Sequence, residues 1–367
     1  MASPPPVSAA QHAVWTQYRD NLPRHLIGIA RHLQFQVMHS LTQDLGHHAL
    51  RLSFGPFLTL VGQQGCRLTT IASELGISKQ ACNQTAKQIE RAGYIERRPA
   101  PEDGRGRLAV LTEKGRELAE QGERLITNVE AAYREFIGEQ VYPDFAAALH
   151  ELRLGLNLSP QAMDSAPRRA RIASGGVVLP LVAEQIQRRI RVRMIAKGHS
   201  GLKMSHSQVL LLIGPEGGRI GEMARIQAVS RQAISAIARD LKGQGYLQRR
   251  PDPVDGRGVV LTLTDAGQAL IADAVDAVRE LEDELEAILG RTGLDRLREL
   301  ARQLYRSLRL EEEIFGPVAT SDPAGAEIDL ESLSRQLRTR LGEARAERLA
   351  RLLRTSEATN SEKGVLT

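Results

Sequence analysis

Apolar residues recur at helical spacing in one short stretch of the chain, and a turn and a more polar helix follow them. The apolar stripe consists of Leu68, Ile71, Ala72 and Leu75. Gly76 and Ile77 then predict a turn, and the hydroxyl of Ser78 is placed to cap the next helix. Gly93 follows that helix, where a glycine commonly ends one. The pattern therefore predicts a helix-turn-helix over residues 68–93.

Two short apolar runs come next and enclose a polar segment. Residues 94–95 and 108–111 are predicted to be strands, and the intervening PAPEDGRG has the glycines and prolines of a tight turn. Thr112 can cap a long helix that continues to Phe136. The predicted fold is therefore mostly α, with its β-structure confined to a small hairpin, or wing.

The whole pattern occurs twice. A shift of 152 residues places RRPAPEDGRG at 97–106 on RRPDPVDGRG at 249–258, with eight of ten positions identical. The same shift aligns Ser78 with Ser230 and Gly115 with Gly267, without a gap. Two copies at so long a period indicate a tandem pair of domains and not a solenoid.

The composition of the connecting segments divides the chain into five parts. Residues 1–20 are expected to form a flexible N-terminal lead, residues 21–158 the first domain and residues 159–176 a linker. Residues 177–315 are the expected second domain, and residues 316–367 a further linker with an amphipathic helix. The leucines of that helix are Leu330, Leu333, Leu337, Leu341, Leu349 and Leu352. Their apolar face needs a partner, either the protein's own body or another chain, which leaves homo-oligomerisation through this helix open.

Composition narrows the function classes. A net charge of +5 permits a polyanionic partner, and two cysteines do not suggest an oxidised secreted scaffold. No apolar run approaches the roughly 20 residues that span a bilayer, and the N-terminus lacks an export signal, so we expect no membrane partner and a cytoplasmic location. The sequence has no phosphate-binding glycine loop, metal cluster or nucleophile–base signature, so it predicts neither an enzyme nor a cofactor.

Three histidines, His25, His32 and His39, recur every seven residues along the first predicted helix. At a rise of 1.5 Å per residue they lie about 10 Å apart, too far for one ion. No metal site is therefore expected.

The wing and the residues after it carry the most specific motif, D-x-R followed by L-T-x-x-G. It consists of Asp103, Arg105, Leu111, Thr112 and Gly115, and again of Asp255, Arg257, Leu263, Thr264 and Gly267. With this motif, both copies resemble the MarR (multiple antibiotic resistance regulator) family of bacterial winged-helix transcription factors. The resemblance covers nearly everything between residues 21 and 310. It implies tandem winged helix-turn-helix domains that form an intramolecular pseudo-dimer, with two recognition helices that enter successive major grooves.

The second helix of each helix-turn-helix carries an outward set of polar side chains suited to double-stranded DNA. In the first copy the set is Ser78, Lys79, Gln80, Asn83, Gln84 and Lys87; in the second it is Ser230, Arg231, Gln232, Ser235 and Arg239. Residues 78–107 carry seven Lys/Arg and four Asp/Glu, and residues 230–259 carry six and three. Each segment is thus +3 in a chain of +5, which concentrates positive charge where a phosphate backbone would lie.

The wing supplies the remaining DNA candidates. They are Arg97, Arg98, Asp103, Arg105 and Arg107 in the first copy, and Arg249, Arg250, Asp255 and Arg257 in the second. Arg105 and Arg257, at the hairpin tips, are expected to enter the minor groove, and the neighbouring aspartates to orient them. The paired arginines at the start of each wing are expected to contact phosphate. The alternative is a solvated polar hairpin without a DNA contact.

The copies differ at positions that matter. Leu75 aligns with Gln227, and Asn83-Gln84 aligns with Ser235-Ala236. A polar residue at an expected core position needs a partner, so the second helix-turn-helix is expected to be looser. Unlike recognition helices predict DNA with unlike half-sites.

The first sixty residues hold aromatic and histidine side chains that the second copy lacks. The candidates for a ligand site are His32, Phe35, His39, Phe54 and Phe57. Because MarR-family members often bind small aromatic acids between the terminal helices and the winged helix, the resemblance implies such a ligand here. Histidine cations would strengthen its binding at mildly acid pH. The alternative is that these residues pack between the two halves of the pseudo-dimer.

These patterns lead to one expected function and one alternative. We expect a sequence-specific double-stranded DNA-binding transcriptional regulator, namely a repressor relieved by a small ligand. The alternative is a winged-helix protein-interaction or architectural module whose specific DNA binding is weak or lost, as the change from Leu75 to Gln227 would suggest.

Overall fold

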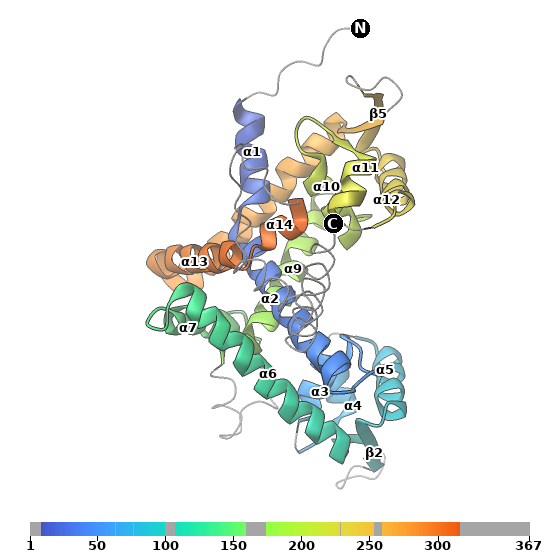
Figure 1. Ribbon diagram of the computed structural model, residues 1–367, viewed down its shortest axis with the longest axis vertical. Helices are drawn as coiled ribbons and strands as arrows, with labels where there is room; N and C mark the ends of the chain where they lie inside the picture. Colours follow the sequence, from blue (N-terminus) through green and yellow to red (C-terminus); the bar gives the residue numbers. More distant parts are fainter. Residues whose placement is uncertain are drawn as a thin grey trace, which may run out of the picture.

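The computed structural model describes two winged-helix units joined by a shared set of helices (Figure 1). The described residues are 9–62, 64–75, 77–99, 107–158, 174–227, 229–252 and 259–315. Most of the expected 159–176 linker and the whole expected 316–367 segment lie outside them.

Most elements follow the same order in both halves of the chain. The first half contains α1 (Ala9–Arg19), α2 (Leu22–His39), the π-helix η1 (Ser40–Asp44), α3 (Phe54–Val61), β1 (Cys66–Arg67), α4 (Leu68–Glu74), α5 (Lys79–Arg91), β2 (Ile95–Pro99), β3 (Arg107–Leu111), α6 (Glu113–Ile137) and α7 (Tyr142–Gly155). The second half contains α9 (Gly175–Ala196), α10 (Met204–Ile213), β4 (Gly218–Arg219), α11 (Ile220–Ile226), α12 (Arg231–Gly243), β5 (Leu247–Pro251), β6 (Val259–Leu263), α13 (Asp265–Ser307) and α14 (Leu310–Phe315). From α3 and from α10 onward the order is the same, except that the counterparts of α6 and α7 form one kinked helix, α13.

Each wing belongs to a small antiparallel sheet of three strands. The strand order is β1-β3-β2 in the first unit and β4-β6-β5 in the second. Arg97 pairs with Ala109 and the aligned Arg249 pairs with Leu261, so the two hairpins share one register. The two-residue strands β1 and β4 were not predicted, because so short a segment has no periodicity of its own.

The caps that the sequence predicts are confirmed. Ser78 Oγ accepts a hydrogen bond from the N–H of Ala81 at 3.1 Å, and Ser230 does the same for Ala233. Thr112 Oγ1 accepts one from the N–H of Gly115 at 3.0 Å, at the start of α6. These bonds satisfy donors that would otherwise have no partner within the helix.

Each winged-helix unit has its own hydrophobic core, and a third core joins the two halves. Buried side chains of α2, α6 and α7 from the first half pack with those of α9, α13 and α14 from the second; among them are Leu26, Leu33, Phe145, Leu152, Val182, Leu285 and Leu304. Gly138, between α6 and α7, and the aligned Gly290, at a kink inside α13, both adopt positive φ, 100° and 68°. The helical core is therefore continuous across both copies, and neither half buries its terminal helices alone.

The expectation of a flexible lead over residues 1–20 is wrong for residues 9–19, which form helix α1. Trp15 is only 7% exposed and belongs to the core of the second winged-helix unit, with Met194 and Val209. Arg19 donates a hydrogen bond to the carbonyl oxygen of Leu211 at 2.7 Å. Since burial of a Trp side chain contributes about 3–5 kcal/mol, this contact orders a segment whose own composition favours disorder.

Helix α9 also begins two residues before the expected boundary at 177.

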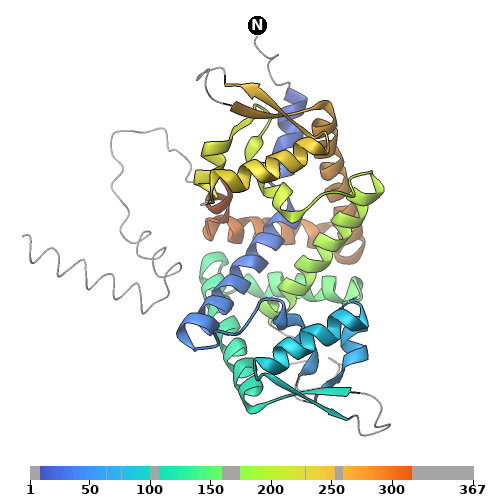
Figure 2. The same ribbon diagram turned by 90° about the vertical axis from the view of Figure 1, so that its right-hand side faces the viewer.

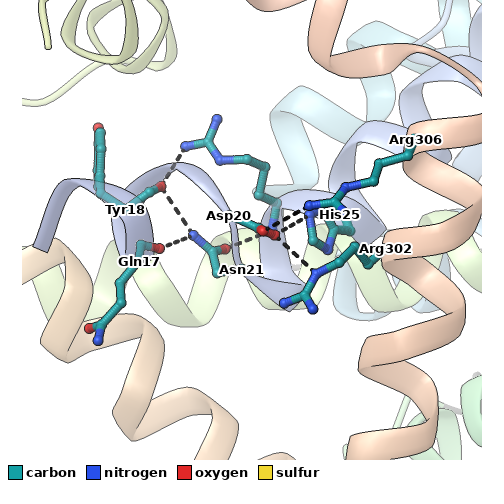
Figure 3. Close-up of polar contacts among 8 residues, drawn as sticks. Gln17, Tyr18, Asp20, Asn21, His25, Arg302 and Arg306 are labelled. Carbon is teal, nitrogen blue, oxygen red and sulfur yellow. Dashed lines mark hydrogen bonds and ion pairs between the residues drawn. The ribbon is translucent and has the colours of Figure 1, made fainter. Parts of the chain in front are cut away.

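The turn between α1 and α2 contacts the second half through Asp20 (Figure 3). One carboxylate oxygen of Asp20 lies 2.9 Å from Nε2 of the buried His25 and 3.3 Å from Nε of Arg302 in α13. Arg306 approaches the other oxygen at 3.4 Å. Burial lowers the pKa of His25 to about 4; Asp20 acts in the opposite direction, and the nearby arginines lower the pKa further. The His25 ring is therefore neutral at pH 7 within this contact.

Candidate nucleic-acid interface

The second helix of each helix-turn-helix, α5 and α12, is called its recognition helix below, and both lie on one face of the molecule. This face is on the right in Figure 1 and is turned toward the viewer in Figure 2. The wing hairpins lie at the two far ends of the same face, and the shared helical core lies between the units. One elongated surface can therefore meet one elongated partner.

Helix α5 buries one side and exposes the predicted reading set. Cys82, Ala86 and Ile89 are buried in the core of the first unit. The predicted residues Ser78, Lys79, Gln80, Asn83, Gln84 and Lys87 are all exposed. Ser78 serves as the helix cap, and the amide of Asn83 donates to the carbonyl oxygen of Lys79 at 2.9 Å. The outward face thus holds amides and cations that can donate to base edges and phosphates.

Helix α12 repeats this division with a different outward set. Ile234, Ala238 and Leu241 are buried. The exposed residues of the predicted set are Ser230, Arg231, Gln232 and Arg239, whereas Ser235 is half-buried. The guanidinium of Arg231 lies beside Gly221 of α11, where an added Cβ would be 3.4 Å from Nε. The second helix therefore presents more guanidinium and less amide than the first.

Strand β2 of the first wing carries arginines that are already paired. Arg97 donates from Nε to Oε2 of Glu90, in α5, at 2.9 Å, and its side chain is 24% exposed. The hydrogen bonds from Arg97 lower the pKa of the Glu90 carboxyl. Arg98 forms an ion pair with Glu96 on the same strand. Both predicted phosphate contacts of this strand thus lie against a carboxylate.

Strand β5 of the second wing differs. Arg249 and Arg250 are exposed, and within the described part of the chain neither has an ion-pair partner. Carboxylates of this unit are engaged elsewhere: Asp252 accepts from Nε and Nη2 of Arg219, at 2.5 and 3.0 Å. Asp240 accepts from Lys203 at 2.6 Å and lies 3.1 Å from Nε2 of His206, and the hydrogen bond from Lys203 holds the pKa of Asp240 well below its ordinary value.

The tips of the wings hold the remaining predictions. Asp103 and Arg105, and their counterparts Asp255 and Arg257, lie outside the described residues. Arg107 begins β3 and is exposed, and the aligned position in β6 is Val259. The minor-groove role of the tips stays a prediction.

The residues proposed for a ligand site are not brought together. Phe54 and Phe57 are fully buried in the core of the first unit, whereas Phe35 is 59% exposed and stacks on His39. Nδ1 of His32 lies 3.0 Å from the hydroxyl of Tyr133. Burial lowers the pKa of His32 to about 4, which disfavours a cation on this ring at mildly acid pH, and the ligand site itself stays a prediction.

Two further findings apply to the described residues. No helix among them is both long enough and apolar enough to cross a membrane. Within the same ranges, no group of three or more His, Cys, Asp or Glu side chains is arranged to hold a metal ion.

Sequence reasoning missed the acidic residues of the interface. Glu90 and Glu96 form ion pairs with the two arginines of the first wing strand, β2. Asp252, directly after the second wing strand β5, forms an ion pair with Arg219. The available signal was the alignment of the two copies, in which Glu90 becomes Lys242 and Ala100 becomes Asp252. A count of net charge hides this difference, because both segments have the same total.

Comparison with known proteins finds one family model that matches within both units. A model of the MarR family matches residues 56–106 and again residues 200–258. The HTH-type transcriptional regulator MT0903.1 of Mycobacterium tuberculosis is 29% identical over 133 residues, which are 36% of this chain and 89% of that protein. An HTH-type transcriptional regulator of Mycobacterium leprae is 29% identical over 112 residues, 30% of this chain and 74% of that protein.

Two solved structures each align with part of this chain. The YusO protein of Bacillus subtilis is 17% identical and aligns with 39% of this chain and 99% of its own, with a TM-score of 0.31. The transcriptional repressor CouR, solved bound to a 23-mer DNA duplex, is 29% identical and aligns with 33% of this chain and 87% of its own, with a TM-score of 0.26.

Proposed function

Because the chain carries two MarR-family winged-helix regions, we propose that it is a sequence-specific transcriptional regulator that binds double-stranded DNA as an intramolecular pseudo-dimer. In this proposal α5 and α12 enter successive major grooves and the wings lie along the flanking backbone. The relatives MT0903.1 and the Mycobacterium leprae protein are named as HTH-type transcriptional regulators.

One observation carries the proposal: both recognition helices lie on the same face of a single chain (Figure 2), and each exposes polar side chains of its predicted set. The core shared by α2, α7, α9 and α13 supports pairing within the chain, since each half contributes side chains that the other buries. Tethered units pair at an effective concentration in the mM range, which favours pairing within one chain over pairing between chains.

We also propose that DNA binding represses and that a small aromatic acid relieves it. The exposed Phe35, stacked on His39 at a centroid distance of 5.9 Å, offers a surface for an aromatic ring. Calorimetry with salicylate-like compounds tests this part, and Phe35→Ala should abolish the binding. Binding that is unchanged in Phe35→Ala, or absent from the wild type, would contradict it.

Selection of bound duplexes from a random pool, followed by salt titration, tests the DNA-binding function. We expect one enriched motif, bound about 10³-fold or more tightly than random DNA, and a steep loss of affinity for both with rising salt. A protein-interaction module would instead enrich no motif and bind all DNA weakly.

A further inference from the structure

The two units differ in where their carboxylates lie relative to the wing strand. In the first unit Glu90 faces Arg97 at 2.9 Å, and Glu96 pairs with Arg98. In the second unit the residues aligned with these two glutamates are Lys242 and Gln248. A carboxylate beside the strand in one unit is therefore a cation in the other.

This exchange changes what the strand arginines can do. An arginine that already donates to a carboxylate must break that charge-assisted bond before it can bind a phosphate, and its charge is compensated locally. Arg249 is exposed and lies on β5, which packs beside α12, and the last turn of α12 carries the exposed Lys242 where the first unit has Glu90. Within the described residues of this unit, Asp240 pairs with Lys203 and Asp252 pairs with Arg219, and neither forms an ion pair with Arg249.

The recognition helices differ in the opposite sense. Helix α5 exposes two adjacent amides, Asn83 and Gln84, each with the donor and acceptor needed to read an adenine edge. At the aligned positions α12 has a half-buried Ser235 and the apolar Ala236. The first unit, in which carboxylates pair with the strand arginines, thus exposes more side chains that can read bases. The second unit, in which the strand arginines have no such partner among the described residues, exposes fewer.

We propose that the two units divide the work on DNA: the second holds the phosphate backbone through Lys242, Arg249 and Arg250, and the first reads the bases. Ion pairing of Arg97 with Glu90 then fixes the angle between α5 and its wing. The inference rests on the proposed function, because it assumes that both units meet one duplex.

Salt dependence separates the two roles. Each phosphate contact contributes about 0.9 to the slope of log affinity against log salt concentration. When one contact is lost, a fourfold rise in salt concentration therefore lowers the affinity by a factor that is about 3.5-fold smaller. Base contacts contribute to the preference for a sequence and little to this slope.

The test uses the full chain and a matched pair of substitutions, Glu90→Gln and Lys242→Gln, with random-sequence duplex DNA over a range of salt. Lys242→Gln is expected to lower the slope by about 0.9. Glu90→Gln frees Arg97 and is expected to raise the slope by a similar amount. Glu135→Gln, at an exposed position near the end of α6, controls for the change in net charge.

A second comparison addresses the arginines themselves. Arg249→Ala is expected to lower the slope by about 0.9, and Arg97→Ala by much less. If the two alanine variants lower it equally, or if Glu90→Gln leaves it unchanged, the division of work is wrong although the protein still binds DNA. A wild-type chain with no salt-dependent DNA binding would instead overturn the proposed function itself.

Discussion

The carboxylate of Glu130, in α6 of the first half, accepts a hydrogen bond from the N–H of Gly176, at the start of α9 in the second half, at 2.8 Å. The same carboxylate accepts from the hydroxyls of Tyr142 and Ser174, both at 2.5 Å, and Glu130 is buried. A carboxylate at a helix N-terminus satisfies donors that the helix leaves open and opposes the positive end of the dipole. The buried Glu130 therefore links the start of α9, in the second half, to α6 in the first half through hydrogen bonds.

Loss of this carboxylate should weaken the whole chain. Glu130→Ala leaves buried donors without an acceptor, and we expect the free energy of unfolding to fall by about 3 kcal/mol. Urea unfolding followed by circular dichroism measures it. The matched control is Glu135→Ala, at an exposed position of the same helix. An equal effect of the two changes would show that Glu130 does not fasten the halves.

The glycine of the L-T-x-x-G motif should not tolerate a methyl group. An added Cβ at Gly115 would lie 2.0 Å from the carbonyl oxygen of Tyr94. Gly115→Ala should therefore destabilise the protein by about 1–3 kcal/mol or more. In the same helix nothing lies within 4 Å of a Cβ at Gly122, so Gly122→Ala should stabilise it by about 0.5–1 kcal/mol. Thermal unfolding of both variants checks the contrast, and a loss at Gly122 as large as at Gly115 would contradict it.

Stability should fall in mild acid because of the buried histidines. The pKa of His32 is about 4 in the folded chain, below its ordinary 6.5, since burial disfavours the charged ring. Between these values the unfolded chain binds more protons, so the contribution of His32 is complete above pH 6.5 and is lost as the pH falls toward 4. His32→Gln should flatten this part of the curve of unfolding free energy against pH. A slope identical to that of the wild type would place the effect elsewhere, for instance at His25.

Base reading by α5 should appear as a change in preference. Replacement of Gln80 or Asn83 by Ala is expected to cost about 1–3 kcal/mol on the cognate site and to relax preference at one base pair. Arg250→Ala should instead weaken binding to all sequences alike. Competition binding with single-base variants of the site distinguishes these patterns. An alanine variant of Gln80 and Asn83 that loses affinity without a change in preference would remove both from the reading set.

The local structure followed from the sequence wherever a cap, a turn or a periodic stripe specified it. The helix-turn-helix and the serine and threonine caps are where the patterns predicted, and a MarR-family model matches within both repeats. The wing hairpin is also present, but its first strand runs from Ile95 to Pro99 and not over 94–95. These features depend on neighbouring residues, which one copy of the motif contains.

What the sequence did not predict depends on contacts between distant segments. Helix α1 is ordered by burial of Trp15 in the second unit, some two hundred residues away along the chain. Likewise, the pairing of Arg97 with Glu90 joins a strand to a helix, and Phe54 and Phe57 lie in a core and not beside Phe35. The roles of the individual DNA candidates stay predictions.

The central claim, that one chain presents both recognition helices to one duplex, is tested most directly by the mass of the protein–DNA complex. Sedimentation of the full chain with a duplex carrying its selected site should give one chain per duplex, on two unlike half-sites about one helical turn apart. Two chains per duplex at every concentration that forms a complex, on a palindromic site, would contradict the claim.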